Sequence, residues 1–374
     1  MSQPLRVALL HNYRDGQQPS MRLYAERLGE ALRRQRVDVT RVRPPSVMPD
    51  RLLRSPLWSK LDAYAGRFAV YPRLVRKLDV DVVHVVDHGQ GHLIGDMDRH
   101  RAIVTCHDVI LLALAAGRIG GALVPQVALQ LFRISLEHVK YAAAIVADSA
   151  QTRRDLVTLV GIDPAKIIVI HPGLNQAFGR DPGSGRAFRG RFGLGDGLLM
   201  LQIGRTFYKN ILGALRVLHR LRGGGVDVRL ARVGRALLGE ERALADRLGV
   251  TTSVVELGAV PDEQMPALYN AVDLLLFPSL YEGFGWPPLE AMASGTPVVC
   301  SRAGSLDEVV GDAALTADPE DVEALSWHAA AVLTDAKLRA TVIDRGLAHA
   351  ARFNWDRTAE QMIAVYRDVA AKAA

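Results

Sequence analysis

Short apolar runs alternate with amphipathic, helix-like segments along the whole chain. Each run has the composition of a buried strand, and a polar or glycine-containing loop follows it. Because helices that join parallel strands make right-handed crossovers, this alternation predicts an α/β protein with open parallel sheets. The runs lie at residues 5–10, 80–86, 102–106, 143–147 and 167–170, and then at 198–203, 226–233, 254–257, 274–277, 297–300 and 313–317.

The chain has 374 residues, which is too long for one typical core and suits two. A segment rich in glycine and arginine, from His171 to Gly197, separates the two series of runs. We therefore predict two Rossmann-like domains, residues 1–175 and 176–355, whose sheets face each other across a deep cleft.

The stretch Phe277–Cys300 carries the densest candidate chemistry and reads F-P-S-L-Y-E-G-F-G-W-P-P-L-E-A-M-A-S-G-T-P-V-V-C. An apolar strand leads into a turn with two glycines, and two prolines then preset the start of a helix. Glu282 is expected on the turn. Glu290 is expected in the first helical turn, where the helix dipole stabilises a carboxylate that can accept hydrogen bonds from a ribose diol. The alternative is an ordinary βα unit with two glutamates on its surface.

A second candidate loop follows the run 198–203 and reads Gly204-Arg205-Thr206-Phe207-Tyr208-Lys209-Asn210. The guanidinium of Arg205 can bind two phosphate oxygens, and Lys209 supplies a compact charge. The alternative is a pair of surface cations at a helix start. The dipole disfavours cations there, so their presence favours an anion between them.

Histidines and aspartates gather in the first half of the chain. His84, His88 and His92 with Asp87 resemble a metal cluster, but His84 lies within a strand and alternation points it away from the others. The pair Asp96/Asp98 lacks the context of a metal motif and is predicted to form a turn. We predict no metal site. His107 ends the run 102–106, where it faces the crevice or, alternatively, the core.

Charge is divided unevenly between the two halves. Residues 1–180 contain 25 Lys and Arg against 16 Asp and Glu, a net of +9, whereas the whole chain has a net charge of +6. Within this half, residues 51–77 combine seven cations with four aromatic residues, and residues 109–132 are almost wholly apolar. These stretches favour either binding to an anionic membrane surface or an apolar groove for the acceptor. The alternative is that they form helices whose apolar side chains pack inward. Arg118, Gly120-Gly121 and Pro125 interrupt the apolar run, which excludes a spanning helix.

Phe277–Cys300 resembles the Glu-x7-Glu signature of the retaining family-4 glycosyltransferases of GT-B fold, with Trp286 in place of the usual Leu or Met. Gly204-Arg205…Lys209-Asn210 resembles a second element of that family. The resemblance is strong over residues 197–320 and looser before them. It also implies that a last helix, about 356–374, joins the first domain.

The resemblance implies a role for each matching residue. His107, Arg205, Lys209 and Glu282 would be catalytic, and on the acceptor side it points to Gly16, Ser20 and Asp108. The loop 14–20 departs from the family, which usually has a Gly-Gly pair there. The donor would lie against a larger set: Gly204, Arg205, Lys209, Val260, Glu282, Gly283, Phe284, Gly285, Leu289 and Glu290.

The expected activity is transfer of a hexose, with retention and without a metal cofactor, from a GDP-mannose or UDP-hexose type of donor to a hydroxyl acceptor. The acceptor can be a glycan, a lipid-linked sugar or a small molecule, and nucleic acid is not expected. A non-hydrolysing sugar-nucleotide epimerase and an inactive nucleotide-sugar-binding protein are the alternatives. With only Cys106 and Cys300, and a strand that begins almost at once, we expect a cytoplasmic protein that either is free in solution or binds the inner face of the membrane.

Overall fold

The computed structural model describes residues 4–12, 19–120 and 124–373. In it the chain divides into two compact units. Unit 1 comprises the residues up to Ala115, then Val124–Asn175 and the segment from Asn354 onward. Unit 2 comprises Gln176–Phe353 and a short segment that follows Ala115. The chain therefore leaves unit 1, forms unit 2 and returns to unit 1 for its last helix.

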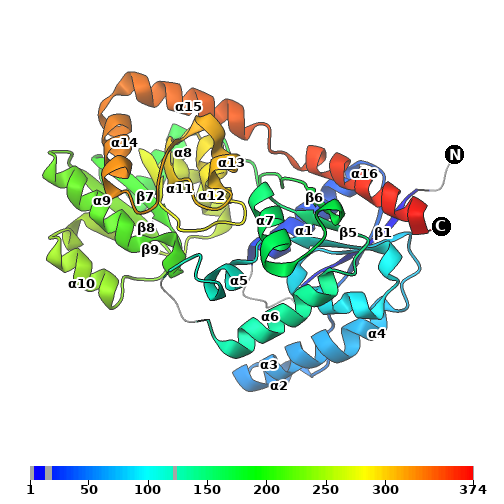
Figure 1. The fold of residues 1–374 in the computed structure, drawn as a ribbon. Helices are drawn as coiled ribbons and strands as arrows, with labels where there is room; N and C mark the ends of the chain where they lie inside the picture. The colour runs from blue at the N-terminus through cyan, green and yellow to red at the C-terminus, as the bar shows by residue number, and fades with distance from the viewer. Residues whose placement is uncertain (1–3, 13–18, 121–123, 374) are drawn as a thin grey trace. The chain divides into compact units, whose positions relative to one another are not determined.

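Unit 1 is built on a six-stranded, wholly parallel sheet of order β2-β1-β3-β4-β5-β6. Figure 1 labels β1, β5 and β6 of this sheet. The chain first moves from β1 to β2 and then continues on the other side of β1. The carboxyl ends of β1 and β3 thus flank the point at which the strand order reverses. The strands are β1 (Arg6–Leu10), β2 (Asp38–Val42), β3 (Val82–Val85), β4 (Ala102–Cys106), β5 (Ala144–Ala147) and β6 (Ile167–Val169).

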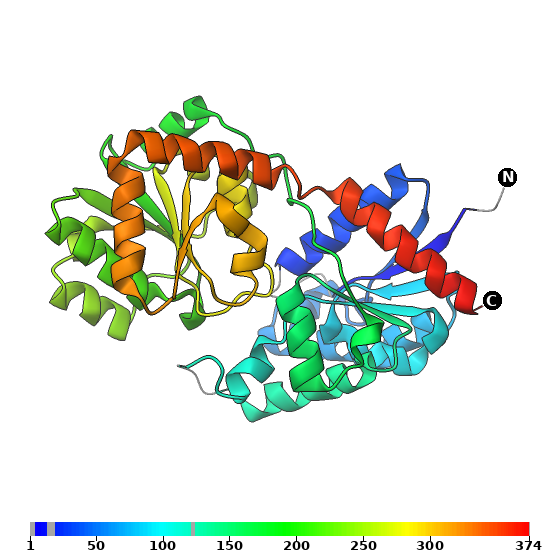
Figure 2. The ribbon, with the colours of Figure 1, turned by 45° about the horizontal axis from the view of Figure 1, so that its top comes forward.

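Helices cover both faces of this sheet (Figures 1 and 2). On one face α1 packs against α16, and Tyr366 of α16 binds His84 of β3 through Oη and Nδ1, 2.7 Å apart. The other face lies against α4 and α6. The helices are α1 (Pro19–Arg34), α2 (Asp50–Leu53), α3 (Pro56–Ala65), α4 (Tyr71–Val75), α5 (Ile110–Ala115), α6 (Gln126–Val139), α7 (Ala150–Asp155) and α16 (Trp355–Ala373), with a 3₁₀ segment at His88–Asp96.

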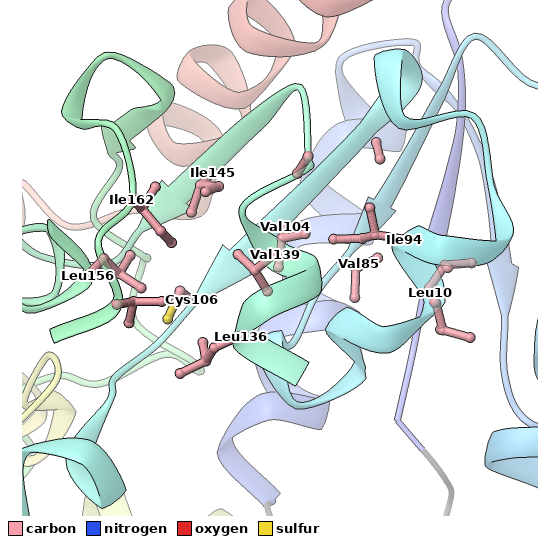
Figure 3. Packing of buried hydrophobic residues seen from close by; sticks show 14 of the residues in the cluster. Leu10, Val85, Ile94, Val104, Cys106, Leu136, Val139, Ile145, Leu156 and Ile162 are labelled. Atoms are coloured by element: carbon pink, nitrogen blue, oxygen red, sulfur yellow. The ribbon is translucent and has the colours of Figure 1, made fainter. Parts of the chain in front are cut away.

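The core of unit 1 forms where alternate residues of the strands meet α4, α6 and the 3₁₀ segment. Figure 3 shows Leu136 and Val139 of α6 close to Val104 and Cys106 of β4, all almost fully buried. Burial of such side chains contributes about 1.5–3 kcal/mol each. This packing fixes the strand ends from which the polar loops of unit 1 emerge.

Unit 2 contains the second six-stranded parallel sheet, of order β12-β11-β10-β7-β8-β9. Its chain moves outward from β7 through β8 to β9, and then returns to the other side of β7 with β10. The order reverses between β7 and β10, which is the position where doubly wound sheets bind ligands. The strands are β7 (Leu198–Ile203), β8 (Val228–Val233), β9 (Val254–Gly258), β10 (Leu274–Phe277), β11 (Val298–Ser301) and β12 (Leu315–Ala317).

The core of unit 2 joins β7, β8 and β10 to α9, α10 and α14. Separately, α12 packs against α15. The helices of this unit are α8 (Pro182–Arg191), α9 (Ile211–Gly223), α10 (Glu240–Arg247), α11 (Met265–Asn270), α12 (Trp286–Ala293), α13 (Leu306–Val310), α14 (Val322–Thr334) and α15 (Ala336–Ala350).

The predicted α/β class with two parallel sheets is confirmed, whereas two helix starts expected from the sequence are wrong. The polar residue Ser20 is expected to cap a helix over residues 21–36, but helix α1 begins at Pro19 and Ser20 lies inside it. Helix α12 begins at Trp286, because Gly285 adopts a left-handed conformation with φ of 106°. Glu290 therefore lies beyond the first turn, which contains no acidic residue. The dipole argument for its carboxylate does not apply.

Candidate functional site

The loops that follow β7 and β10 meet at the point where the unit-2 strand order reverses. Lys209 lies at the end of the first loop and Glu282 on the second, and their Nζ and Oε1 atoms are 2.6 Å apart. Both side chains are largely buried. The ammonium also lies about 5 Å from the ring centres of Tyr208 and Phe277. An ammonium has three N–H donors, so this contact leaves others for an anion.

The turn that carries Glu282 is held by a serine far along the chain. Ser305 donates from its hydroxyl to the carbonyl oxygens of Glu282 and Phe284, at 3.1 and 2.7 Å, and its amide donates to Glu282 as well. A Cβ on Gly304, which has a φ of 64°, would lie 2.4 Å from the Glu282 carbonyl oxygen. This close approach explains the glycine. Nothing in the sequence pattern pointed to Ser305.

The turn after β7 is equally restricted. Gly204 has a φ of 146°, and a Cβ there would lie 2.3 Å from Cγ of Lys209. Glycine therefore lets the lysine stem cross over the strand end. Arg205 is exposed, which leaves its planar guanidinium accessible. Asn210 then caps α9 by accepting a hydrogen bond from the amide of Gly213.

Glu290 lies on α12 and accepts a hydrogen bond from the hydroxyl of Tyr269, with 2.8 Å between Oε2 and Oη. Burial raises the pKa of Glu290 to about 7, although the Tyr269 hydroxyl opposes this shift. Its other oxygen, Oε1, has no hydrogen-bond partner among the described residues. The site thus contains a carboxyl group that titrates close to neutral pH.

The remaining donor residues predicted from the sequence lie in unit 2, on the loop after β10, on α12 and after β9. Phe284 is buried, and its ring contacts those of Trp286 and Phe353. The Leu289 side chain is fully buried in unit 2, so only its backbone can face a ligand. Val260 is half-buried just beyond the end of β9.

Unit 1 has its own polar cluster where its strand order reverses. Asn12 follows β1, Asp87 follows β3, and the Asn12 amide donates to the Asp87 carboxylate. Gln90 donates to the Asn12 side-chain oxygen at 3.2 Å. Burial lowers the pKa of the neighbouring His11 to about 4, which keeps this imidazole neutral. The cluster offers amide and carboxylate groups suited to hydroxyls. Its members are far apart in the chain, so no sequence pattern reveals it.

His107 is buried and both of its ring nitrogens are engaged within unit 1. Nδ1 lies 2.6 Å from Oδ2 of Asp148, and Nε2 lies 2.8 Å from the carbonyl oxygen of Val86. Burial lowers the pKa of His107, but the Asp148 carboxylate outweighs this effect and raises it to about 9. The charged imidazolium, held between these two acceptors, links the ends of β3, β4 and β5. A direct bond from His107 to a sugar would require loss of the Val86 contact.

The other acceptor-side residues are less informative. Ser20 is half-buried in α1, and Gly16 lies outside the described residues. Asp108 accepts a hydrogen bond from the amide of Ile110 at the start of α5.

The residues that resembled a metal cluster have separate protein partners. His84 binds Tyr366 and Thr105, whereas His92 lies 3.4 Å from the carbonyl oxygen of Arg67. Asp96 pairs with Arg76, and Asp98 accepts from the amide of His100. Among the described residues, no group of three or more His, Cys, Asp or Glu side chains is arranged to hold a metal ion.

Two family models match this chain. Residues 21–178 match the model described as Glycosyltransferase Family 4, and residues 187–349 match the model described as Glycosyl transferases group 1. A segment of 111 residues is 52% identical to the O-antigen chain mannosyltransferase B of Escherichia coli, over 30% of this chain and 29% of the relative. A segment of 250 residues is 36% identical to the D-inositol 3-phosphate glycosyltransferase of Acidothermus cellulolyticus, over 63% of this chain and 55% of the relative.

The matched segments thus span about a third to a half of these relatives' own lengths. A solved structure of Anabaena Alr3699/HepE in complex with UDP-glucose is similar over 97% of this chain and 100% of that one, with a TM-score of 0.73 and 17% identity. At that identity the likeness concerns the fold. Each half of this chain thus matches one glycosyltransferase family model, and the chain as a whole shares its fold with that solved structure.

Proposed function

We propose that this chain transfers a hexose from a nucleoside-diphosphate sugar to a hydroxyl acceptor, with retention of the anomeric configuration. The observation that carries the proposal is the meeting of Lys209 and Glu282 at the reversal of strand order in unit 2. Sugar and nucleotide sites of doubly wound sheets lie at this position. The matches to a mannosyltransferase and to an inositol phosphate glycosyltransferase support the same reaction class.

The donor is assigned to unit 2. Arg205 and Lys209 would bind the diphosphate oxygens, and Glu290 would accept hydrogen bonds from the ribose. The turn at Glu282, with the amides of Gly283 and its neighbours, would hold the sugar. The bond between the anomeric carbon and the phosphate oxygen breaks, and one to the acceptor oxygen forms. The acceptor proton passes to the leaving diphosphate, whose charge the two cations stabilise.

The donor assignment leaves the polar cluster of unit 1 for the acceptor. Asn12, Asp87 and Gln90 present the amide and carboxylate groups that recognise hydroxyls. His107, held by Asp148, would position the strand ends around this cluster.

The proposal includes an anionic membrane surface as a partner of unit 1. Leu57, Trp58, Leu61, Tyr64 and Phe68 are exposed and recur at helical spacing along α3 and the turn after it. We call these five residues the apolar face of α3. A large exposed apolar surface of this kind marks an interaction site.

A second exposed stripe lies on α6. Val127, Leu131 and Ile134 are spaced as on one helix face, and Val127 is 74% exposed. The two stripes flank the same 3₁₀ segment, because the carbonyl oxygen of Gly89 accepts hydrogen bonds from both Arg67 and Ser135.

Cations lie on the same two helices and on the neighbouring α2 and its end. The exposed residues Arg51, Arg54, Lys60 and Arg133 have no ion-pair partner among the described residues. Basic side chains with interleaved aromatic residues fit an anionic bilayer surface, and each such cation contributes on the order of 1 kcal/mol there. Among the described residues no helix is long and apolar enough to span a membrane.

Product analysis tests the reaction. The protein is incubated with UDP-, GDP- and ADP-hexoses and a panel of glycan, lipid-linked and small hydroxyl acceptors, and the products are identified by mass spectrometry and NMR. We expect one donor to yield a glycosylated acceptor with the donor's anomeric configuration. Release of an epimerised sugar nucleotide without an acceptor, or donor binding without any product, would overturn the proposal.

A further inference from the structure

A buried arginine lies directly beneath the turn that carries Arg205 and Lys209. Arg232 is on β8, opposite Gln202 of β7 in the sheet register, and is only 1% exposed. It is the largest of the fully buried side chains in the described residues. Arginine stays charged even when buried, so the burial of this side chain needs a physical explanation.

The guanidinium of Arg232 holds the backbone of this turn. Nε donates to Oε1 of Gln202 at 3.0 Å, and Nη2 donates to the carbonyl oxygen of Gly204 at 3.3 Å. Gln202 in turn donates from Nε2 to the carbonyl oxygen of Lys209 at 3.4 Å. One buried cation is thereby linked to both ends of the turn.

A second arginine holds the next carbonyl. Arg235 donates from Nε to the carbonyl oxygen of Arg205 at 3.1 Å, while two of its nitrogens pair with the carboxylate of Glu241 at 2.6 Å. The charge of Arg235 is therefore neutralised within the protein. Arg232 differs, because it makes no hydrogen bond to a carboxylate, and its Nη1 is buried without a partner among the described residues.

A buried cation without a hydrogen-bonded anion is costly, and a neutral side chain at this position would avoid the cost. Burial lowers the pKa of Arg232, while Glu241 at longer range opposes this shift. The guanidinium contacts the turn that carries Arg205 and Lys209, where its charge adds to theirs, while Glu241 and Glu256 act on it without a hydrogen bond. A diphosphate bound there would supply the missing counter-charge.

We infer that Arg232 is a positioning residue for diphosphate binding: its guanidinium, with Gln202, fixes the 204–209 turn and adds its charge beneath it. This inference rests on the proposed donor site in unit 2. It concerns the diphosphate alone, since neither side chain contacts Glu290 or Tyr269. The base and ribose of the donor should be bound equally well when the Arg232 guanidinium is removed.

Calorimetry with paired ligands tests the inference. The probes are UDP with uridine and GDP with guanosine, together with inorganic pyrophosphate, and the variants are Arg232→Met, Arg232→Lys and Gln202→Met. We expect each variant to bind the diphosphates and pyrophosphate on the order of tenfold more weakly, and the nucleoside within twofold of wild type. Arg229→Met is the matched control, because it removes another cation of β8 that contacts Leu194 rather than the turn.

The outcomes separate the two proposals. If the wild-type protein binds no diphosphate, the donor site itself is wrong. If it does bind one and Arg232→Met binds it equally well, only the role of Arg232 is overturned. Should Arg232→Met fail to fold, Gln202→Met decides, and unchanged diphosphate affinity in that variant rejects the inference. If Arg232→Lys binds the diphosphates with wild-type affinity, the positioning role is rejected. Lysine keeps the positive charge but lacks the planar guanidinium that bonds both Gln202 and Gly204.

Discussion

The Lys209 ammonium and the Glu282 carboxylate, 2.6 Å apart, join the two loops at the reversal of strand order in unit 2. Replacing Lys209 with Met would remove the proposed phosphate ligand and would leave the largely buried Glu282 without this ion pair. We expect affinity for the nucleoside diphosphate to fall by about 1.5–3 kcal/mol, measured by calorimetry. Lys372→Met is the control, since its pair with Asp368 is exposed. Equal loss in both variants would contradict the assignment.

Donor binding should depend on pH through Glu290. In the proposed donor site the ionised carboxylate would accept hydrogen bonds from both ribose hydroxyls, and burial raises its pKa to about 7. Affinity for a ribonucleoside diphosphate should therefore fall as the pH drops through about 7. Glu290→Gln should remove this dependence. Tyr269→Phe removes a donor that favours the carboxylate, so the midpoint should move to higher pH.

A 2′-deoxynucleotide serves as the ligand control for that experiment, because it lacks one of the two hydroxyls. Its binding should change less with pH than that of the ribonucleotide. Identical pH profiles for both ligands, or a profile that Glu290→Gln leaves unchanged, would show that Glu290 does not bind the ribose.

The buried pair of His107 and Asp148 should stabilise unit 1. Asp148→Asn leaves a buried imidazolium without its counter-charge, and breaking such a pair costs about 3–5 kcal/mol. Because the pKa of His107 is raised to about 9, the stabilisation is complete below about pH 6.5 and is lost as the pH rises through 9. Urea unfolding between pH 6 and 9.5 measures this. Wild-type and variant curves with the same pH slope would argue against it.

We expect transfer to proceed without a divalent metal, because the proposed roles of Arg205 and Lys209 would provide the charge that stabilises the leaving diphosphate. Activity should survive exhaustive treatment with EDTA. Loss of activity on chelation, with recovery on addition of magnesium or manganese, would contradict this expectation. Asp96→Asn and Asp98→Asn would then locate the ion.

The apolar face of α3 should bind anionic vesicles. Replacing Leu57, Trp58 and Leu61 with Ser should abolish co-sedimentation with vesicles that contain phosphatidylglycerol. Wild-type binding should weaken as salt rises, since the Debye length falls from about 10 Å at 0.1 M to 3 Å at 1 M. Trp327→Ser is the control, because this exposed tryptophan lies in unit 2. Binding that ignores the anionic lipid fraction would point to an acceptor in solution.

All strands of the two sheets except β2 could be predicted from the sequence, because buried parallel strands form distinct apolar runs. The prediction missed the edge strand β2, because it is half polar and most of its side chains are exposed. Contacts between distant segments could not. Ser305 supports the Glu282 turn from another loop, and Asp148 meets His107 from a neighbouring strand end. The helix start at Trp286 depends on the left-handed conformation of Gly285, which the two following prolines obscured. The periodic pattern therefore predicts where the loops begin, and tertiary contacts decide what their residues do.

The return of the chain to unit 1 has a consequence for the order of folding during synthesis. Unit 2 is almost continuous, from Gln176 to Phe353, and can close as soon as those residues have emerged from the ribosome. Unit 1 begins first and is completed last, because α16 covers one face of its sheet and supplies Tyr366 to His84. Until residue 355 and those after it are made, α1 covers this face without its partner α16. A nascent chain that stalls before α16 would thus carry a folded second unit beside an unfinished first one.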